Sequence, residues 1–433
     1  MLKAEDNFKI TQTGPDSSAG RLLRRYWQPV GLEQELEHIR PAKPIRVLGE
    51  DLVLFRDTDG EIGLVGRYCP HRGVDLAYGR LEHGGLRCLF HGWLFDRKGA
   101  CLEQPAEPIE SNYYKKIHHK AYPCRVINGM IFAWMGPANS PPMPVLDALN
   151  APESHCFAYK GLIEANWLQA TEVGIDPAHA SFLHRFFEDD DPSDSYGQQF
   201  RDTTVGAKIP VTELLRKHHR PEITIEKTDY GLRIFARRDL QSAGQHIRVT
   251  NLVFPSAIVI PMQTDMTITQ WHVPIDNERT YWYGLFCSYG EAVDKAKMKE
   301  QRDALYDTHI YRPKRNSENG YGFNPDEQKK VTYTGMGMDI NVHDNWAVES
   351  PGPIQDRTKE HLGTTDRAII ANRRTLLQRI DELENGKEPP VPKFEDGPPL
   401  AIDTLCSADD WKSFWRTTAE GRRQSASWAA GSD

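Results

Sequence analysis

Two short motifs, each pairing a cysteine with a histidine, constrain the fold of this chain more than any other feature. Cys69 and His71 stand two positions apart, and Cys88 and His91 follow after 16 intervening residues. Two thiols and two imidazoles at such spacing can hold a metal centre with four protein ligands. The chain must then bring two loops together, and the sequence around both motifs is typical of short β strands with tight turns.

The same four ligands suit either zinc or a Rieske [2Fe–2S] cluster, in which two cysteines hold one iron and two histidines hold the other. A zinc site more often pairs cysteine with cysteine and histidine with histidine. The mixed pairing here favours the cluster. Gly73 and Gly92 would let the loops turn tightly, and Trp93 would either shield the cluster from water or simply pack in the core.

The chain is long enough for two or three domains, because a single core rarely grows to 433 residues. Strand-like runs with turn signals fill residues 44–136, and a proline-rich linker covers 137–153. Helical spacing follows at 164–187, and 353–383 predicts two helical segments. The polar, proline-rich tail after about 385 is expected on the surface. The predicted division is an N-terminal helical and extended segment at 1–40, a β domain at 41–138 and a larger domain at 139–433.

Charge and composition exclude several classes of protein. The net charge of −8 disfavours nucleic acid as a partner, since a basic footprint would be expected there. The sequence contains no apolar run of about 18 residues, which is the length that a membrane-spanning helix needs. The first residues lack the apolar stretch of a secretory signal. Seven cysteines, an odd number, argue against a disulfide framework. We therefore expect a cytoplasmic location.

A second candidate metal site lies at His179 and His184. On a regular helix these residues would point about 140° apart, so a distorted or π-type turn is needed to bring them together. Two histidines and one carboxylate form the facial triad of non-haem Fe(II) oxygenases. Asp176 could orient a histidine ligand through a hydrogen bond, or cap a helix before Pro177, and both roles are compatible.

Taken together, the motifs C-x-H-x16-C-x2-H and D-x2-H-x4-H resemble those of the α subunits of Rieske non-haem iron ring-hydroxylating oxygenases. The branch that includes phthalate dioxygenase is most similar. This resemblance extends over nearly the whole chain, with RRYWQP at 24–29 and ESPGPIQDRTKEHLGTTDRAII at 349–370. It implies an α+β protein: a Rieske antiparallel β domain, then a helix-grip (START-like) catalytic domain built on an antiparallel sheet.

The resemblance also implies the roles of particular residues. Cys69, His71, Cys88 and His91 would bind the [2Fe–2S] cluster, and His179 and His184 the mononuclear Fe(II). The third iron ligand would be an aspartate on a late helix, which we assign to Asp356, with weaker alternatives at Glu349, Glu360 and Asp366. Asn166 would lie close to the iron.

A head-to-tail homotrimer is the quaternary structure that the resemblance implies, and two trimers could stack into a hexamer. The cluster of one subunit would lie beside the iron of the next, with Asp176 linking His91 of one chain to His179 of its neighbour. Electrons would come from NADH through a separate flavin and iron–sulfur reductase. No G-x-G-x-x-G motif between a strand and a helix is present here, which agrees with a reductase on another chain.

The implied reaction is O2-dependent cis-dihydroxylation of an aromatic carboxylate. A buried carboxylate favours a cationic partner, and Lys208, Arg237 and Arg248 are candidates, although each could instead be a surface charge. Ala180 offers no hydroxyl where a phthalate-specific member would have a polar residue. The expected substrate is of the phthalate, isophthalate, chlorobenzoate or phenoxybenzoate type, and Ala180 argues against phthalate itself. The alternatives are a Rieske monooxygenase or O-demethylase on the same architecture, a Rieske electron carrier without oxygenase activity, and a structural zinc module.

Overall fold

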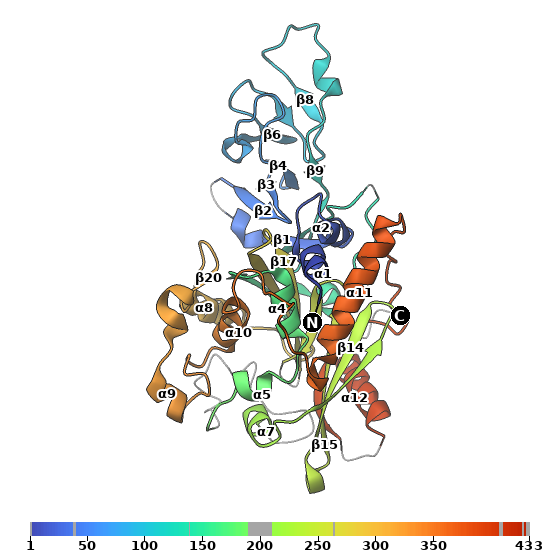
Figure 1. Cartoon of the computed structure of the whole chain (residues 1–433). Helices are drawn as coiled ribbons and strands as arrows, with labels where there is room; N and C mark the ends of the chain where they lie inside the picture. Colours follow the sequence, from blue (N-terminus) through green and yellow to red (C-terminus); the bar gives the residue numbers. More distant parts are fainter. Residues whose placement is uncertain are drawn as a thin grey trace. The chain divides into compact units, whose positions relative to one another are not determined.

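The computed structural model describes residues 2–37, 40–137, 139–188, 210–262, 265–406, 410–426 and 428–429. The chain divides into two compact units (Figure 1). The β unit comprises residues 12–143 and 273–277, and the larger unit comprises residues 1–11, 144–272 and 278–433. Lys208 lies outside the described residues, so the structure does not describe its predicted role.

The β unit is built from three small antiparallel sheets. Their strand orders are β1-β11-β10, β2-β3-β4-β9 and β5-β6-β7-β8. The strands are β1 (Gln28–Leu32), β2 (Ala42–Val47), β3 (Glu50–Arg56), β4 (Ile62–Gly66), β5 (Arg80–Glu82), β6 (Gly85–Arg87), β7 (Leu94–Phe95), β8 (Cys101–Glu103), β9 (Ala121–Tyr122), β10 (Cys124–Ile127) and β11 (Met130–Ala133). The α-helix α2 (Ser18–Leu23) belongs to the same unit. Val53, Phe55 and Val65 form the centre of a core that also includes Cys69 and Cys88. Gly60, between β3 and β4, and Gly99, between β7 and β8, adopt positive φ.

The larger unit is organised around one sheet with the order β12-β18-β17-β16-β15-β14-β13, to which β21 adds by pairing with β15. The strands are β12 (Cys156–Ile163), β13 (Glu222–Lys227), β14 (Gly231–Asp239), β15 (Gln245–Val253), β16 (Ala257–Pro261), β17 (Met266–Pro274), β18 (Thr280–Ser288) and β21 (Ile402–Cys406). The registers described for β12–β18, for β13 through β17 and for β15–β21 are antiparallel. This confirms the predicted α+β organisation, with a large antiparallel sheet after the β domain.

Helices and two short strands complete the larger unit. They are α1 (Ala4–Thr11), α3 (Asp147–Asn150), α4 (Trp167–Gly174), α5 (Ala180–Leu183), α7 (Val211–Lys217), α8 (Lys295–Leu305), α9 (Pro325–Lys330), α10 (Ile340–Glu349), α11 (Arg367–Glu384), α12 (Trp411–Ser425), β19 (Tyr306–Asp307) and β20 (Arg312–Pro313). Within the described ranges, no helix has both the length and the apolar character that crossing a membrane requires.

Helices α11 and α12 pack on opposite faces of the sheet. Successive residues of a strand point to opposite faces, and on β14 Ile234 packs with Ala368 of α11 whereas Phe235 packs with Trp415 of α12. Helix α11 covers only part of its face of the sheet, and the rest of that face lines a pocket. The C-terminal segment therefore contributes a strand and a helix to the fold, and the prediction of a surface tail is wrong for β21 and α12.

The segment before α11 also differs from the prediction of two helices in 353–383. Residues 353–363 form bends, a turn at 357–358 and irregular backbone, and the long helix begins only at Arg367. Gly352 adopts a φ of 94° and precedes a proline, a combination that does not allow α10 to continue. Asp356 consequently lies in a turn and not on a helix.

Helix α4 is fixed at two points to segments that come much later in the chain. The Gln169 side-chain amide donates to the carbonyl of Val348, at the end of α10, over 2.7 Å. Glu172 is buried and accepts from Arg357 at 2.9 Å and from Arg373 of α11. Burial alone would raise the pKa of Glu172, but the two guanidinium groups hold it below its ordinary value. α4 is therefore held against α10 and α11.

We expect Glu172→Ala to lower the free energy of unfolding of the larger unit by about 3–5 kcal/mol, because it leaves two buried guanidinium groups without their shared carboxylate. Because the pKa of Glu172 is lowered in the folded state, its contribution is present above the pKa of the unfolded chain and is lost as pH falls through the folded-state pKa. Urea denaturation at several pH values measures both effects.

Glu382→Ala is the matched control, since Glu382 lies on the surface of α11 in an ion pair with Arg379. Exposed pairs of this kind contribute little. Equal stability of the two variants at neutral pH would contradict the structural role of Glu172.

Candidate metal centres and active site

In the β unit, the two cysteine–histidine motifs occupy two loops with the same backbone pattern. The first loop follows β4, and the second connects β6 and β7. The N–H of Gly73 donates to the carbonyl of Cys69, and the N–H of Gly92 donates to that of Cys88. Both glycines adopt φ near +74°, a conformation that disfavours other residues. Each loop therefore turns back tightly just after its cysteine and histidine.

The four side chains of these motifs meet between the loops. The ring centroids of His71 and His91 lie 4.5 Å apart, and the thiol of Cys88 is close enough to that of Cys69 to raise its pKa. The thiols are buried, whereas both imidazoles are partly exposed. Trp93 is buried and stacks on His71 at 4.4 Å, which covers one side of the group.

The chemistry of this group fits a cluster with two sulfur and two nitrogen ligands. Burial raises the pKa of the Cys69 thiol to about 11, so the thiolate form needs a nearby cation to be stable at neutral pH. The Nδ1 atom of His91 is buried and has no hydrogen-bond partner within the described part of the chain. An iron held by the two imidazoles would supply the missing partner.

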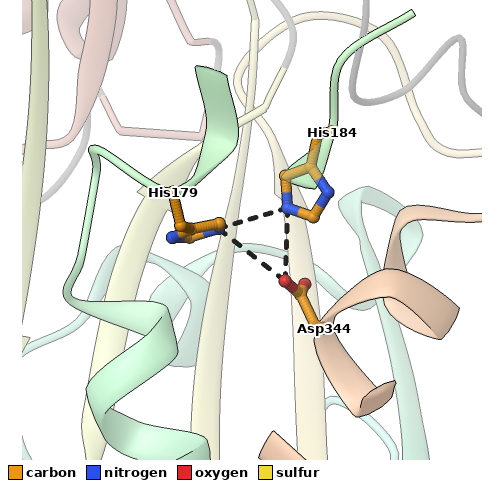
Figure 2. Close-up of side chains that lie close together, drawn as sticks. All are labelled: His179, His184 and Asp344. Atoms are coloured by element: carbon orange, nitrogen blue, oxygen red, sulfur yellow. Dashed lines mark hydrogen bonds and ion pairs between the residues drawn. The ribbon is translucent and has the colours of Figure 1, made fainter. Parts of the chain in front are cut away.

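In the larger unit, His179, His184 and Asp344 point toward one another (Figure 2). The two Nε2 atoms are 3.2 Å apart, and the Asp344 Oδ1 atom lies 3.2 Å from His184 Nε2 and 3.7 Å from His179 Nε2. Ligands bound about 2.1 Å from one ion at right angles to each other lie about 3 Å apart. The three atoms could therefore hold one ion on a single face and leave its other positions open.

The backbone brings His179 and His184 together without a π turn. Helix α5 is only four residues long, and His179 and His184 flank it as its N-cap and C-cap residues. The chain leaves helical geometry at His184, where φ is −104° and ψ is 28°. The predicted distortion thus takes the form of a short helix that ends between the two histidines.

The protonation states expected at this site also fit metal binding. Burial lowers the pKa of His179, and the neighbouring His184 lowers it further. Burial alone would raise the pKa of Asp344, but the histidines hold it below its ordinary value. Neutral imidazoles and an ionised carboxylate are the forms that bind a metal.

Asp344 is the carboxylate that joins the two histidines, and the assignment of this position to Asp356 is wrong. Asp356 is half exposed, accepts from the hydroxyl of Thr358 at 2.6 Å and forms an ion pair with Lys359 at 3.0 Å. The prediction placed the third ligand in the segment after α10, whereas the helix that packs against α5 is α10 itself. The local sequence does not single out Asp344, because Asp339 and Glu349 flank it at the two ends of α10. The weaker alternatives are also engaged elsewhere, Glu349 with Tyr321, Glu360 with Arg373 and Asp366 with the N–H of Gly363.

The two other predicted catalytic residues differ in their placement. Asp176 Oδ2 lies 3.8 Å from Nδ1 of His179, close to the site. Asn166 is fully buried and acts as the N-cap of α4, where its side chain accepts from the N–H of Leu168 and donates to the carbonyl of Thr11. These contacts give Asn166 a structural role as a helix cap. Asn166 is not among the residues that line the pocket at the histidines.

A pocket opens from the three clustered side chains to the open face of the sheet. Its walls come from α4, α5, α7, α10 and the strands, with apolar residues such as Ile163, Ile175, Val211 and Ile260. Arg248 lines this pocket as predicted, but Arg237 points to the opposite face and pairs with Glu222. Sequence reasoning missed the pocket residues Arg238, His246, His272, Asp344 and Asp403.

Comparison with known proteins agrees with this architecture. Residues 26–114 match the Rieske [2Fe-2S] domain family, and residues 133–425 match the family described as LigXa C-terminal domain like. The chain is 34% identical to the phthalate 4,5-dioxygenase oxygenase subunit of Pseudomonas putida, over 96% of this chain and 95% of that one. It is 32% identical to the 5,5'-dehydrodivanillate O-demethylase oxygenase subunit of a Sphingobium strain, over 90% and 83% of the two chains.

Solved structures show the same fold. The Pseudomonas putida CBB5 NdmA QL mutant with theobromine matches with a TM-score of 0.58 and 18% identity, over 85% of this chain and 94% of that one. The chain belongs to the Rieske non-haem iron oxygenases, as an oxygenase component. Its cofactors are accordingly a Rieske [2Fe–2S] cluster and a mononuclear iron, which excludes the structural zinc module and the simple electron carrier.

We expect Asp344→Ala to lower the iron content from about three to about two atoms per chain, because it removes one of the three side chains that could hold the mononuclear iron and leaves the cluster intact. Iron analysis together with the visible absorption of the cluster measures the two sites separately. Asp356→Ala is the matched control and should keep its iron. Loss of iron from Asp356→Ala, with retention in Asp344→Ala, would reverse the assignment.

Proposed function

We propose that this protein is the terminal oxygenase of a system that oxidises an aromatic carboxylate with O2, and that it receives its electrons from a separate NADH-dependent flavin and iron–sulfur reductase. The observation that carries the proposal is a single pocket with His179, His184 and Asp344 in one wall and guanidinium groups on its sheet face. Arginine recognises carboxylates through paired hydrogen bonds.

The names of several relatives support the substrate class. Besides the phthalate enzyme, the chain is 30% identical to the 3-chlorobenzoate-3,4-dioxygenase oxygenase subunit of Comamonas testosteroni and to phenoxybenzoate dioxygenase subunit alpha of Ectopseudomonas oleovorans. All three act on an aromatic ring bearing a carboxylate. The apolar walls of the pocket suit such a ring, and its arginines suit the acid group.

Each group of residues has a distinct part in this proposal. When bound, the cluster and the mononuclear iron supply electron transfer and O2 activation. Cys69, His71, Cys88 and His91 would hold the cluster, while His179, His184 and Asp344 would hold the iron and leave positions open for O2. The pocket residues bind the ring, exclude water and orient the carbon to be oxidised.

Dihydroxylation is the reaction we favour, and O-demethylation is a second candidate. The second candidate rests on the demethylase relative, which is nearly as similar as the phthalate enzyme. With ¹⁸O2, dihydroxylation places two labelled oxygens in the product, and monooxygenation or demethylation leaves at most one in the organic product. Mass spectrometry of the product therefore distinguishes the two reactions.

Supplied with NADH and a phthalate-type reductase, the protein should consume O2 in a substrate-dependent manner. We would compare phthalate, isophthalate, terephthalate, 3-chlorobenzoate and phenoxybenzoate. Tight coupling of O2 uptake to product for one compound is the expected result. An iron-replete protein that responds to none of them would keep its place in the family but would exclude aromatic carboxylates as the substrate class.

We propose in addition that electrons reach the iron from a neighbouring subunit of a homotrimer. Exposed aromatic side chains border a groove on the outer side of His179, namely Phe182, Phe323, Tyr333 and Trp346. Around the cluster loops of the β unit, Tyr68, Leu89, Phe90 and Tyr113 are also exposed. Exposed apolar clusters of this kind mark protein contacts. A second copy of this chain could seat its cluster loops in the groove, where Asp176 would lie between the two metal centres.

Asp176→Asn should preserve both metal sites and the trimer but lower turnover by about 100-fold, because the amide cannot hold the charge that orients His179 and its partner across the interface. Iron analysis, light scattering and the rate of cluster reoxidation in the presence of substrate measure these properties separately. Asp356→Asn serves as control. Normal turnover in Asp176→Asn would remove this residue from the electron path.

A further inference from the structure

The open face of the sheet carries a line of charged residues on adjacent strands. Arg238 on β14 pairs in register with His246 on β15, and Arg248 on β15 pairs with Asp403 on β21. Because side chains alternate along a strand, these four residues share one face. All four line the pocket that contains His179 and His184. The neighbouring Arg237, one residue out of phase, points to the other face.

Three of these residues form a closed group around Asp403. One carboxylate oxygen accepts from Arg248 Nη1 at 2.6 Å, and the other lies 2.5 Å from Nε2 of His246. The second terminal nitrogen of Arg248 donates to the carbonyl of Pro261 at 3.0 Å. The charge of Arg248 is therefore already neutralised by Asp403. Burial lowers the pKa of His246, so the imidazole adds no positive charge at neutral pH.

Arg238 is in a different situation. Its side chain is 1% exposed, and its partners are the carbonyl of His218 at 2.9 Å, the hydroxyl of Ser181 at 3.3 Å and Nδ1 of His246 at 3.5 Å. All three partners are neutral. Within the described residues no carboxylate forms an ion pair with Arg238. Burial lowers the pKa of Arg238 to about 10, which still leaves it charged at neutral pH.

A buried guanidinium group with neutral partners alone is costly, and an anion in the adjacent pocket would offset that cost. We propose that Arg238 binds the carboxylate of the substrate, and that Asp403, by neutralising Arg248, restricts the pocket to aromatic acids with one carboxylate. The inference rests on the proposed function and narrows its substrate class. On this face of the sheet the described charges are Arg238, Arg248 and Asp403, which together leave one positive charge for the ligand, while the pocket carboxylates Asp176 and Asp344 lie beside His179 and His184. A dicarboxylate would place its second acid group against Asp403.

Binding to the intact, oxidised protein in the absence of reductant tests this inference without turnover. Isothermal titration calorimetry would compare 3-chlorobenzoate, phthalate and the neutral 3-chlorobenzamide. The variants are Arg238→Gln, Asp403→Asn and, as matched control, Arg237→Gln on the opposite face of the same strand. Circular dichroism and iron content verify that each variant is folded.

For the wild-type protein we expect 3-chlorobenzoate to bind at least about tenfold more tightly than phthalate. Arg238→Gln should weaken 3-chlorobenzoate by about 10–100-fold, because it removes a charged hydrogen-bonding partner, and Arg237→Gln should not change it. Asp403→Asn should reduce the preference for the monocarboxylate by about tenfold, since it frees the charge of Arg248.

The inference is overturned if phthalate binds the wild-type protein more tightly than 3-chlorobenzoate, or if Arg238→Gln binds like Arg237→Gln. These comparisons remain decisive if Asp403→Asn does not fold. A different result, in which 3-chlorobenzamide binds and neither acid does, would instead contradict the proposed substrate class itself. The two failures are thus distinguishable.

Discussion

The active site depends on the contact between α4 and the C-terminal end of α10. The histidines follow α4 directly, whereas Asp344 belongs to α10, far along the chain. Gln169 binds the end of α10, and Glu172 binds Arg357 and α11. Because both side chains lie on one short helix, Gln169 fixes the position of α4 relative to α10 and Glu172 fixes it relative to α11. The three atoms proposed to bind iron can meet within 4 Å only if this packing holds.

The parts of the site that sequence alone revealed are those encoded in short stretches. Cys69, His71, Cys88 and His91 are recognisable because each pair lies in one loop, and the loop pattern follows from a glycine just beyond each pair. The pair His179 and His184 was likewise found from its spacing. The order of a β domain followed by a sheet with helices was also readable, since strand-like runs and turn residues are local signals.

The parts that sequence missed depend on contacts between distant segments. Several acids follow α10 within a short stretch, and only the packing of α4 against α10 selects Asp344 over Asp356. The choice between Arg237 and Arg238 depends on strand phase, and a shift of one residue reverses the face. The role of the C-terminal segment could not be read from its proline-rich composition, because β21 becomes a strand only by pairing with β15.

The position of Asp403 on β21 separates two properties of the protein along its sequence. The residues proposed to hold the metals all precede residue 345, whereas the acid that balances the pocket charge arrives on a strand near the C-terminus. Strand β21 joins the sheet by pairing with β15, and α12 packs against β21. The acid proposed to balance the pocket charge thus lies on a different stretch of chain from the residues proposed to hold the metals, whereas Arg238 lies between His184 and Asp344 in sequence. Exchange of the C-terminal stretch between related enzymes offers a route by which substrate range diverges while the oxygen chemistry is retained.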